Sequence, residues 1–138
     1  MKARVIQPEG FPPPRGYANG MLANNTLHVA GQIGWDGNAE IISDEFPEQF
    51  AKALDNVLAV VTAAGGEGTD IADMTIFVTD IQAYIKNASA LREVWAARLG
   101  SHYPAMALIG ISELVHPRAL VEIQATAHLG GDAPNNPA

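Results

Sequence analysis

A glutamate inside the apolar C-terminal segment ALVEIQATAHL, residues 119–129, is the first residue whose surroundings suggest chemistry. In a β-strand successive side chains point to opposite faces, so Val121 and Ile123 share one face while Glu122 and Gln124 share the other. The first face is wholly apolar and predicts a core strand. Glu122 is then either an ordinary surface carboxylate or a carboxylate in a cleft, where it can act as a general base.

The sequence offers few other reactive patterns. It has no cysteine, which excludes thiolate catalysis and cysteine-ligated zinc. No two of its four histidines have the spacing of helical metal ligands, and no serine lies in a nucleophile elbow. The cluster GGEG at residues 65–68 lacks the Lys-Ser/Thr pair that follows in a phosphate-binding loop. We therefore expect no metal site and no cofactor.

Composition and charge restrict the domain organisation and the partners. The chain has 138 residues, of which 48% are hydrophobic, enough for one domain with a core that needs no disulfides. We expect this domain at residues 1–129 and a flexible tail at 130–138. A net charge of −7 repels phosphate backbones and argues against a nucleic-acid partner. Without a signal peptide or an apolar run of roughly 18 residues, we expect a cytoplasmic protein with no membrane partner.

Two apolar stripes with a three- and four-residue repeat predict helices. The first runs from Phe46 to Ala64, with acidic residues near its start and two glycines after its end. The second runs from Ile81 to Leu99, with Asp80 as its N-cap and Gly100 as its stop. Each helix has a single apolar stripe, so both need a sheet to cover.

Six short segments with strand character supply that sheet: ARVIQ, ANGMLA, TLHVAGQIG, MTIFVTD, AMALIGIS and ALVEIQATAHL. The order β-β-β-α-β-α-β-β predicts an α+β domain, a mixed sheet with both helices on one face. On the other face we expect His28, Met106, Leu108 and Gly110, a set too apolar to remain in water. A closed homo-oligomer that buries this face follows from that expectation.

Several ordered segments resemble the Rid family, the YjgF-type reactive-intermediate deaminases. They are VAGQIG, then ALDNVLAVVTAAGGEGTDIADMTIFVTDIQAY, then PAMALIGISELVHPRALVEIQATAHL, so that the resemblance covers roughly residues 16–129. It implies a chorismate-mutase-like subunit that forms a homotrimer through its sheets, with three clefts between subunits. It also implies hydrolysis of a 2-imino acid to a 2-keto acid and ammonia, with a small molecule as the substrate.

Three positions of the implied site match this sequence. Glu122 falls where the family has a glutamate that handles the hydrolytic water, and Tyr17 in GYANG falls where it has a tyrosine that faces the substrate. Gly31 matches the glycine of the GQI segment, whose backbone approaches a substrate closely because it has no Cβ. The resemblance therefore assigns catalysis to Glu122 and Tyr17 and substrate contact to Gly31.

Two positions depart from the family. Rid deaminases have Pro-Ala-Arg where this chain has Pro104-Ala105-Met106, and that arginine clamps the substrate carboxylate through two charge-assisted hydrogen bonds. Losing such an anchor costs on the order of 2–4 kcal/mol of transition-state binding. A family asparagine on the second helix is replaced by Arg92 when the residues are counted back from Met106 without gaps.

Two interpretations of these departures remain open. In the first, the cleft is retuned: Arg92, Arg15 or Arg118 supplies a new cation, while Met106 and Trp35 form an apolar wall for a larger substrate. In the second, Met106 only packs and the arginines are solvated surface residues.

The sequence accordingly supports three functions in descending order. The first is an atypical Rid-family hydrolase acting on a small imine or enamine, with standard 2-imino acid deamination in doubt because Met106 replaces the arginine. The second is a non-catalytic trimer that binds a metabolite or has a regulatory or chaperone-like role. The third is a ribonuclease, against which the acidic charge argues.

Overall fold

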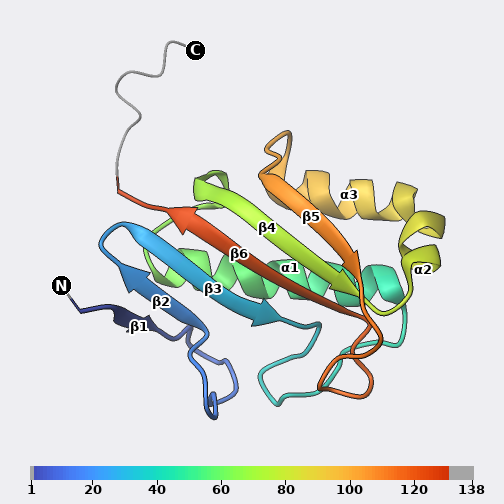
Figure 1. Cartoon of the computed structure of the whole chain (residues 1–138), viewed down its shortest axis with the longest axis horizontal. Helices are drawn as coiled ribbons and strands as arrows, with labels where there is room; N and C mark the ends of the chain where they lie inside the picture. Colours follow the sequence, from blue (N-terminus) through green and yellow to red (C-terminus); the bar gives the residue numbers. More distant parts are fainter. Residues whose placement is uncertain (1, 131–138) are drawn as a thin grey trace.

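A six-stranded mixed sheet organises the protein and carries its helices on one side (Figure 1). The computed structural model describes residues 2–130, so the tail expected at 130–138 lies outside the described residues except for Gly130. The strands are β1 (Arg4–Ile6), β2 (Gly20–Ala23), β3 (Thr26–Gln32), β4 (Ile71–Val78), β5 (Ala105–Gly110) and β6 (Val121–His128). Their order in the sheet is β1-β2-β3-β6-β4-β5, with β4 and β5 parallel and the other neighbours antiparallel. The α+β class is confirmed, and the elements follow the predicted order except that two helices stand in place of the second one.

The first predicted helix is α1 (Phe46–Ala63), which ends one residue earlier than expected. Its apolar stripe is buried against β3 and β6 because those positions share one face of the helix. Glu48 in the first turn suits the positive end of the helix dipole. At the other end Gly65 takes a φ of 92°, a left-handed conformation that glycine adopts without cost, and the chain leaves the helix there.

The second predicted helix is divided into α2 (Ile81–Lys86) and α3 (Ala88–Leu99), so the expectation of one continuous helix is wrong. The Asp80 side chain caps α2 as predicted, since it accepts from the amides of Gln82 and Ala83 at 2.9 and 3.3 Å. The division falls at Asn87, whose side-chain amide donates to the Ala83 carbonyl at 2.7 Å. A side chain that binds nearby backbone in this way competes with regular helix, and Asn87 leaves helical geometry.

The side chains of β5 point to the opposite faces of the sheet from those predicted. Met106, Leu108 and Gly110 pair in register with the core-facing residues of β4, so they point toward the helices and not to the open face. Of the four residues expected on the open face only His28 lies there, since it pairs with Met21 and lies next to the buried Leu27 and Val29. The prediction failed because AMALIG is apolar in both phases, so alternation alone cannot assign its faces.

The open face is therefore more polar than expected. Near β5 it presents Ala105, Ala107 and Ile109 beside Phe77 of β4, and Ile109 is 42% exposed. Toward the centre it carries Gln124, Thr126, His28 and Asp73. Burial of this face in a homo-oligomer stays a prediction. No helix of residues 2–130 is long and apolar enough to cross a membrane.

Two amides on the buried stripe of α1 hold the loops that follow β3 and precede β6. Gln49, with none of its surface exposed, donates to the carbonyls of Ser43 and Arg118 and accepts from the amide of Leu120, all at 2.9–3.0 Å. Asn56 lies about two turns further along the same face of α1 and donates to the carbonyls of Ile33 and Trp35 at 2.9 and 3.0 Å. Buried backbone polar groups need such partners, so α1 fixes both loops.

Replacing Gln49 by leucine tests this attachment. The substitution keeps the side-chain volume but leaves two carbonyls and one amide without their partner, so we expect unfolding to become easier by about 2–4 kcal/mol. Chemical denaturation of Gln49→Leu measures this loss, and Glu48→Gln at the exposed neighbouring position is the control, with an effect within about 0.5 kcal/mol. Equal stability of the two variants would contradict the role given to Gln49.

Candidate functional site

Glu122 lies on the open face of the sheet, in the central strand β6. It pairs with Phe77 of β4, while its neighbours Val121 and Ile123 point into the core, as the alternation of this segment predicts. The side chain is about half-buried, and this burial raises the pKa of its carboxyl above the usual value of 4.5. No hydrogen-bond donor among residues 2–130 offsets the desolvation. The site thus holds a carboxylate that is partly removed from water and has no hydrogen-bond partner within residues 2–130.

A β-bulge places Gly31 directly against this carboxylate. Val29 pairs with Ala125 and Gln32 with Ile123, so β3 has one residue more than β6 between these pairs. Bulges of this kind are common beside active sites, where they redirect side chains. A methyl group at position 31 would lie 2.6 Å from Cδ of Glu122 and 2.7 Å from Oε2. Only a glycine leaves this room for the carboxylate in its present position.

Buried amides tie the bulge to the loop that carries Tyr17. The Gln32 side chain donates to the Ala30 carbonyl at 3.1 Å and to Oδ1 of Asn19 at 3.2 Å. The Asn19 carbonyl in turn accepts from the amide of Ala30 at 2.9 Å, and its side chain donates to Gln7 at 2.9 Å. Asn19 lies two residues after Tyr17, so one polar network holds the tyrosine loop and the bulge together.

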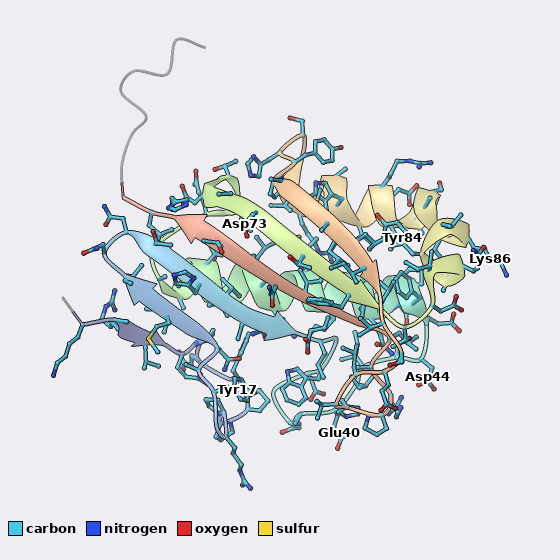
Figure 2. The ribbon with its side chains drawn as sticks, viewed as in Figure 1. Tyr17, Glu40, Asp44, Asp73, Tyr84 and Lys86 are labelled. Carbon is cyan, nitrogen blue, oxygen red and sulfur yellow. The ribbon has the colours of Figure 1, made fainter. Side chains whose placement is uncertain are left out.

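These elements enclose a cleft of about 460 Å³ on the surface of the protomer. Five of the residues singled out from the sequence line it together: Arg15, Tyr17, Gly31, Trp35 and Glu122. Ala30, Ile33, Val115 and His116 complete the lining. Figure 2 shows Tyr17 at the edge of the molecule where the loops after β1 and β3 lie, the latter carrying Glu40. The cleft falls in the size range of small-molecule sites, on the order of 300–1,000 Å³.

Trp35 and His116 form one wall of the cleft, and sequence analysis did not single out His116. The two rings meet edge to face, with centroids 6.4 Å apart and an interplanar angle of 87°. Nδ1 of His116 accepts from the amide of Arg118 at 3.1 Å, which leaves the ring proton on Nε2 as a free donor. A lone histidine in a loop carries no spacing signal, so only the folded chain brings His116 to Glu122.

Met106 and Arg92 lie elsewhere in the protomer. They line a separate cavity of about 180 Å³ on the helix side of the sheet, together with Phe50, Ile76, Tyr84, Ala88, Leu91, Trp95 and Tyr103. Figure 2 shows Tyr84 at the right of the view, on the side of α2 and α3, and Tyr17 at the lower edge of the molecule. Met106 is 44% exposed there, beside a stacked pair formed by Trp95 and Tyr103. Within one protomer, Met106 and Arg92 therefore do not share a cavity with Glu122.

The three arginines considered as replacement anchors lie in three different environments. Arg118 forms an ion pair with Asp44 at 2.8 Å, and Arg92 lines the Met106 cavity. Arg15 alone of the three lines the Glu122 cleft. No group of three or more His, Asp or Glu side chains in the described part of the chain is placed to hold a metal ion.

The contact between Gly31 and Glu122 predicts the effect of a single methyl group. Gly31 has no left-handed φ, so Gly31→Ala leaves the backbone unstrained and instead displaces the Glu122 carboxylate. We expect a loss of stability of about 1–3 kcal/mol for crowding of this kind, which disappears in a Glu122→Ala background because the three atoms nearest to the methyl group all belong to the removed part of Glu122. A double-mutant cycle measured by chemical denaturation gives both values. Equal costs in the two backgrounds would show that the carboxylate is not in contact with position 31.

The raised pKa of Glu122 predicts a pH-dependent cost to folding. The folded protein holds the carboxyl proton more tightly than the unfolded chain, so stability is lost as the pH rises from 4.5 through the raised pKa. Glu122→Gln removes this loss. We expect the glutamine variant to melt at a higher temperature than the wild type near neutral pH, and the advantage to vanish below pH 4.5. Glu113→Gln, at an exposed position, controls for the change in net charge; a pH-independent difference would contradict the assignment.

Comparison with known proteins gives one consistent result. The family model described as endoribonuclease L-PSP matches residues 10–129. A RutC family protein from Pyrococcus horikoshii is 32% identical over 126 residues, which cover 90% of this chain and 96% of that protein. A second RutC family protein, from Pyrococcus abyssi, is 29% identical over 130 residues, covering 93% of this chain and 98% of the relative.

Solved structures agree with this match. A putative endoribonuclease from Thermotoga maritima has a TM-score of 0.82 at 26% identity, covering 95% of this chain and all of the other. RidA from an Antarctic Psychrobacter species has a TM-score of 0.79 at 27% identity, covering 91% and 99%. TdcF from E. coli, solved with bound serine, has the same TM-score and identity, covering 92% and 99%. The chain therefore belongs to the endoribonuclease L-PSP family, the family of the Rid and YjgF proteins that its sequence resembles.

Proposed function

We propose that this protein hydrolyses a small imine or enamine metabolite in the Glu122 cleft. The observation that carries the proposal is the half-buried Glu122 carboxylate, which lies against Gly31 in the lining of a cleft and has no hydrogen-bond partner in the described part of the chain. A desolvated carboxylate with a raised pKa is a better base than one in water, and such groups are concentrated at functional sites. The serine bound in TdcF from E. coli supports a ligand of amino-acid size for a cleft of this family.

The proposed reaction uses water and one proton carrier. Glu122 takes a proton from water as the water oxygen attacks the carbon of the C=N bond, and the π-electron pair of that bond moves to nitrogen. That proton then passes from Glu122 to nitrogen and gives a carbinolamine. Glu122 next takes the remaining proton of the carbinol hydroxyl and returns it to the amine nitrogen. The C–N bond breaks with its electron pair leaving on ammonia, and the carbinol oxygen forms the carbonyl. The products are a carbonyl compound and ammonia, so no electrons are exchanged and no cofactor is required.

Substrate orientation falls to the other lining residues. Arg15 supplies a cation for a carboxylate, and the Tyr17 hydroxyl and Nε2 of His116 supply hydrogen-bond donors. Arg15 takes the place of the arginine that Met106 replaces, from a different direction. The bidentate clamp of standard 2-imino acid deaminases is therefore absent, and we expect a substrate preference different from theirs.

We further propose that the protein acts as a homotrimer. Met106 and Glu122 point to opposite sides of one sheet, so they can serve a single ligand only if one protomer brings its Met106 cavity to the Glu122 cleft of another. The exposed Ile109 and its neighbour Phe77 on the open face support the same assembly, which would remove them from water.

A second candidate is a non-catalytic trimer that binds a metabolite or a regulatory partner. The missing arginine favours it, because the cleft then retains a ligand-sized volume without the family anchor. RNA cleavage has the least support, because the net charge is −7 and Arg15 is the only Lys or Arg lining the cleft within the described chain.

Hydrolysis of 2-imino acids, generated in place by an amino-acid oxidase, tests the proposal. We expect the wild type to accelerate loss of the imine and Glu122→Ala to reduce kcat/KM by at least about 100-fold, the range of a positioned general base. The exposed Glu113→Ala is the matched control and should keep wild-type activity.

Other outcomes decide between the candidates. An inactive wild type that still binds keto acids would contradict hydrolysis and favour the metabolite-binding protein. Activity that is gained only in Met106→Arg would show that the cleft is intact but lacks its anchor, so that Arg15 does not replace it.

A further inference from the structure

A second hollow adjoins the Glu122 cleft and shares three residues with it. This outer compartment, of about 350 Å³, is lined by Pro12, Pro13, Arg15, Tyr17, Trp35 and Ala39. Arg15, Tyr17 and Trp35 also line the Glu122 cleft, so the two hollows meet at these three side chains. Pro12 and Pro13, to which the proposed reaction gives no role, belong to the proline-rich segment FPPPRG and line this compartment only.

The lining of the outer compartment suits an apolar group. Two proline rings, the Trp35 indole and the Ala39 methyl offer carbon surface, and the Tyr17 ring adds an aromatic face. Arg15 is the only charged side chain among its six lining residues, and it lies at the junction with the Glu122 cleft. An apolar group in this compartment would remove carbon surface from water on both sides, which is favourable in proportion to the area buried.

Hydrogen bonds within the chain hold the wall of the compartment in place. The carbonyl of Trp35 is held by Asn56, and the backbone of Trp35 forms a bridge with Ile41. Between them Asp36 accepts from the amides of Asn38 and Glu40 at 2.8 and 3.1 Å and closes a tight turn. A wall that is ordered before binding reduces the entropy lost when a ligand enters.

We propose that the outer compartment binds the apolar side chain of the substrate. This inference rests on the proposed function of the Glu122 cleft and adds its substrate class: imines or enamines of amino acids with a bulky apolar side chain, aromatic above all. The reacting carbon lies beside Glu122, the carboxylate meets Arg15 at the junction, and the side chain extends over Trp35 toward Pro12 and Pro13. A three-carbon acid would leave the apolar compartment filled with water.

Imines derived from phenylalanine and from alanine test the compartment. We expect the wild type to favour the phenylalanine imine in kcat/KM by at least about tenfold, the gain from burying an aromatic ring. Ala39→Phe fills the compartment and should remove this preference while leaving the alanine imine within about twofold. Position 39 has a φ of 60°, a left-handed conformation that is unfavourable for a bulky side chain, so the circular dichroism spectrum of Ala39→Phe is compared with that of the wild type.

Asn38→Phe is the matched control, because Asn38 is exposed in the same turn and does not line the compartment. It should keep the wild-type preference. Equal kcat/KM for the two imines in the wild type, or the same preference in Ala39→Phe, would overturn the compartment while leaving the proposed hydrolysis intact.

Calorimetric binding of phenylpyruvate and pyruvate separates the two proposals from each other. These are the keto acids that the two imines would yield. Tighter binding of phenylpyruvate by the wild type and by Glu122→Gln, lost in Ala39→Phe, supports the compartment even if no imine is hydrolysed. Equal affinities for both acids would contradict it whatever the outcome of the activity assay.

Discussion

The cleft depends on a constraint that lies beneath it, the need of buried backbone groups for hydrogen-bond partners. The loops after β3 and before β6 pass over the end of α1, and the amides of Gln49 and Asn56 provide the partners that these loops lack. Each bond contributes only about 1 kcal/mol, but leaving one buried group unpaired costs about 1–3 kcal/mol. Neither loop can therefore move far while α1 stays packed. Trp35 and His116 lie in these two loops and owe their positions to this attachment.

Glu122 shows the opposite situation, because its carboxylate has no hydrogen-bond partner among the residues that the structure describes. The buried amides behind it are paired: Gln32 and Asn19 bond to each other and to the backbone of the bulge. The bulge places Gly31 so close to the carboxylate that no other residue fits without displacing it. A group that costs stability where its neighbours are fully paired is typical of a functional site. This contrast, more than the family match, indicates that the cleft is the functional site.

Local patterns in the sequence were sufficient to predict most helices and strands, but not always which face of each is buried. β6 around Glu122 and α1 each have a single apolar face, so the sequence alone shows which side of each element is buried. In β5 both faces are apolar, and the parallel pairing with β4, a tertiary contact, decides which face points toward the helices. The same holds for the arginines: the choice of Arg15 over Arg92 requires knowing which elements meet. A polar residue on the buried stripe of α1, as at Gln49, was a signal that could have been noticed from spacing alone.

The most direct test of the account is the titration of the Glu122 carboxyl group by NMR, with its signal assigned by comparison with Glu122→Gln. If the carboxyl is desolvated and faces the ligand, its midpoint lies above the usual glutamate value of 4.5 and shifts again when a keto acid occupies the cleft. A midpoint at or below 4.5 that does not respond to ligand would show a solvated surface carboxylate. In that case the cleft would have no base, and the proposed hydrolysis would be wrong.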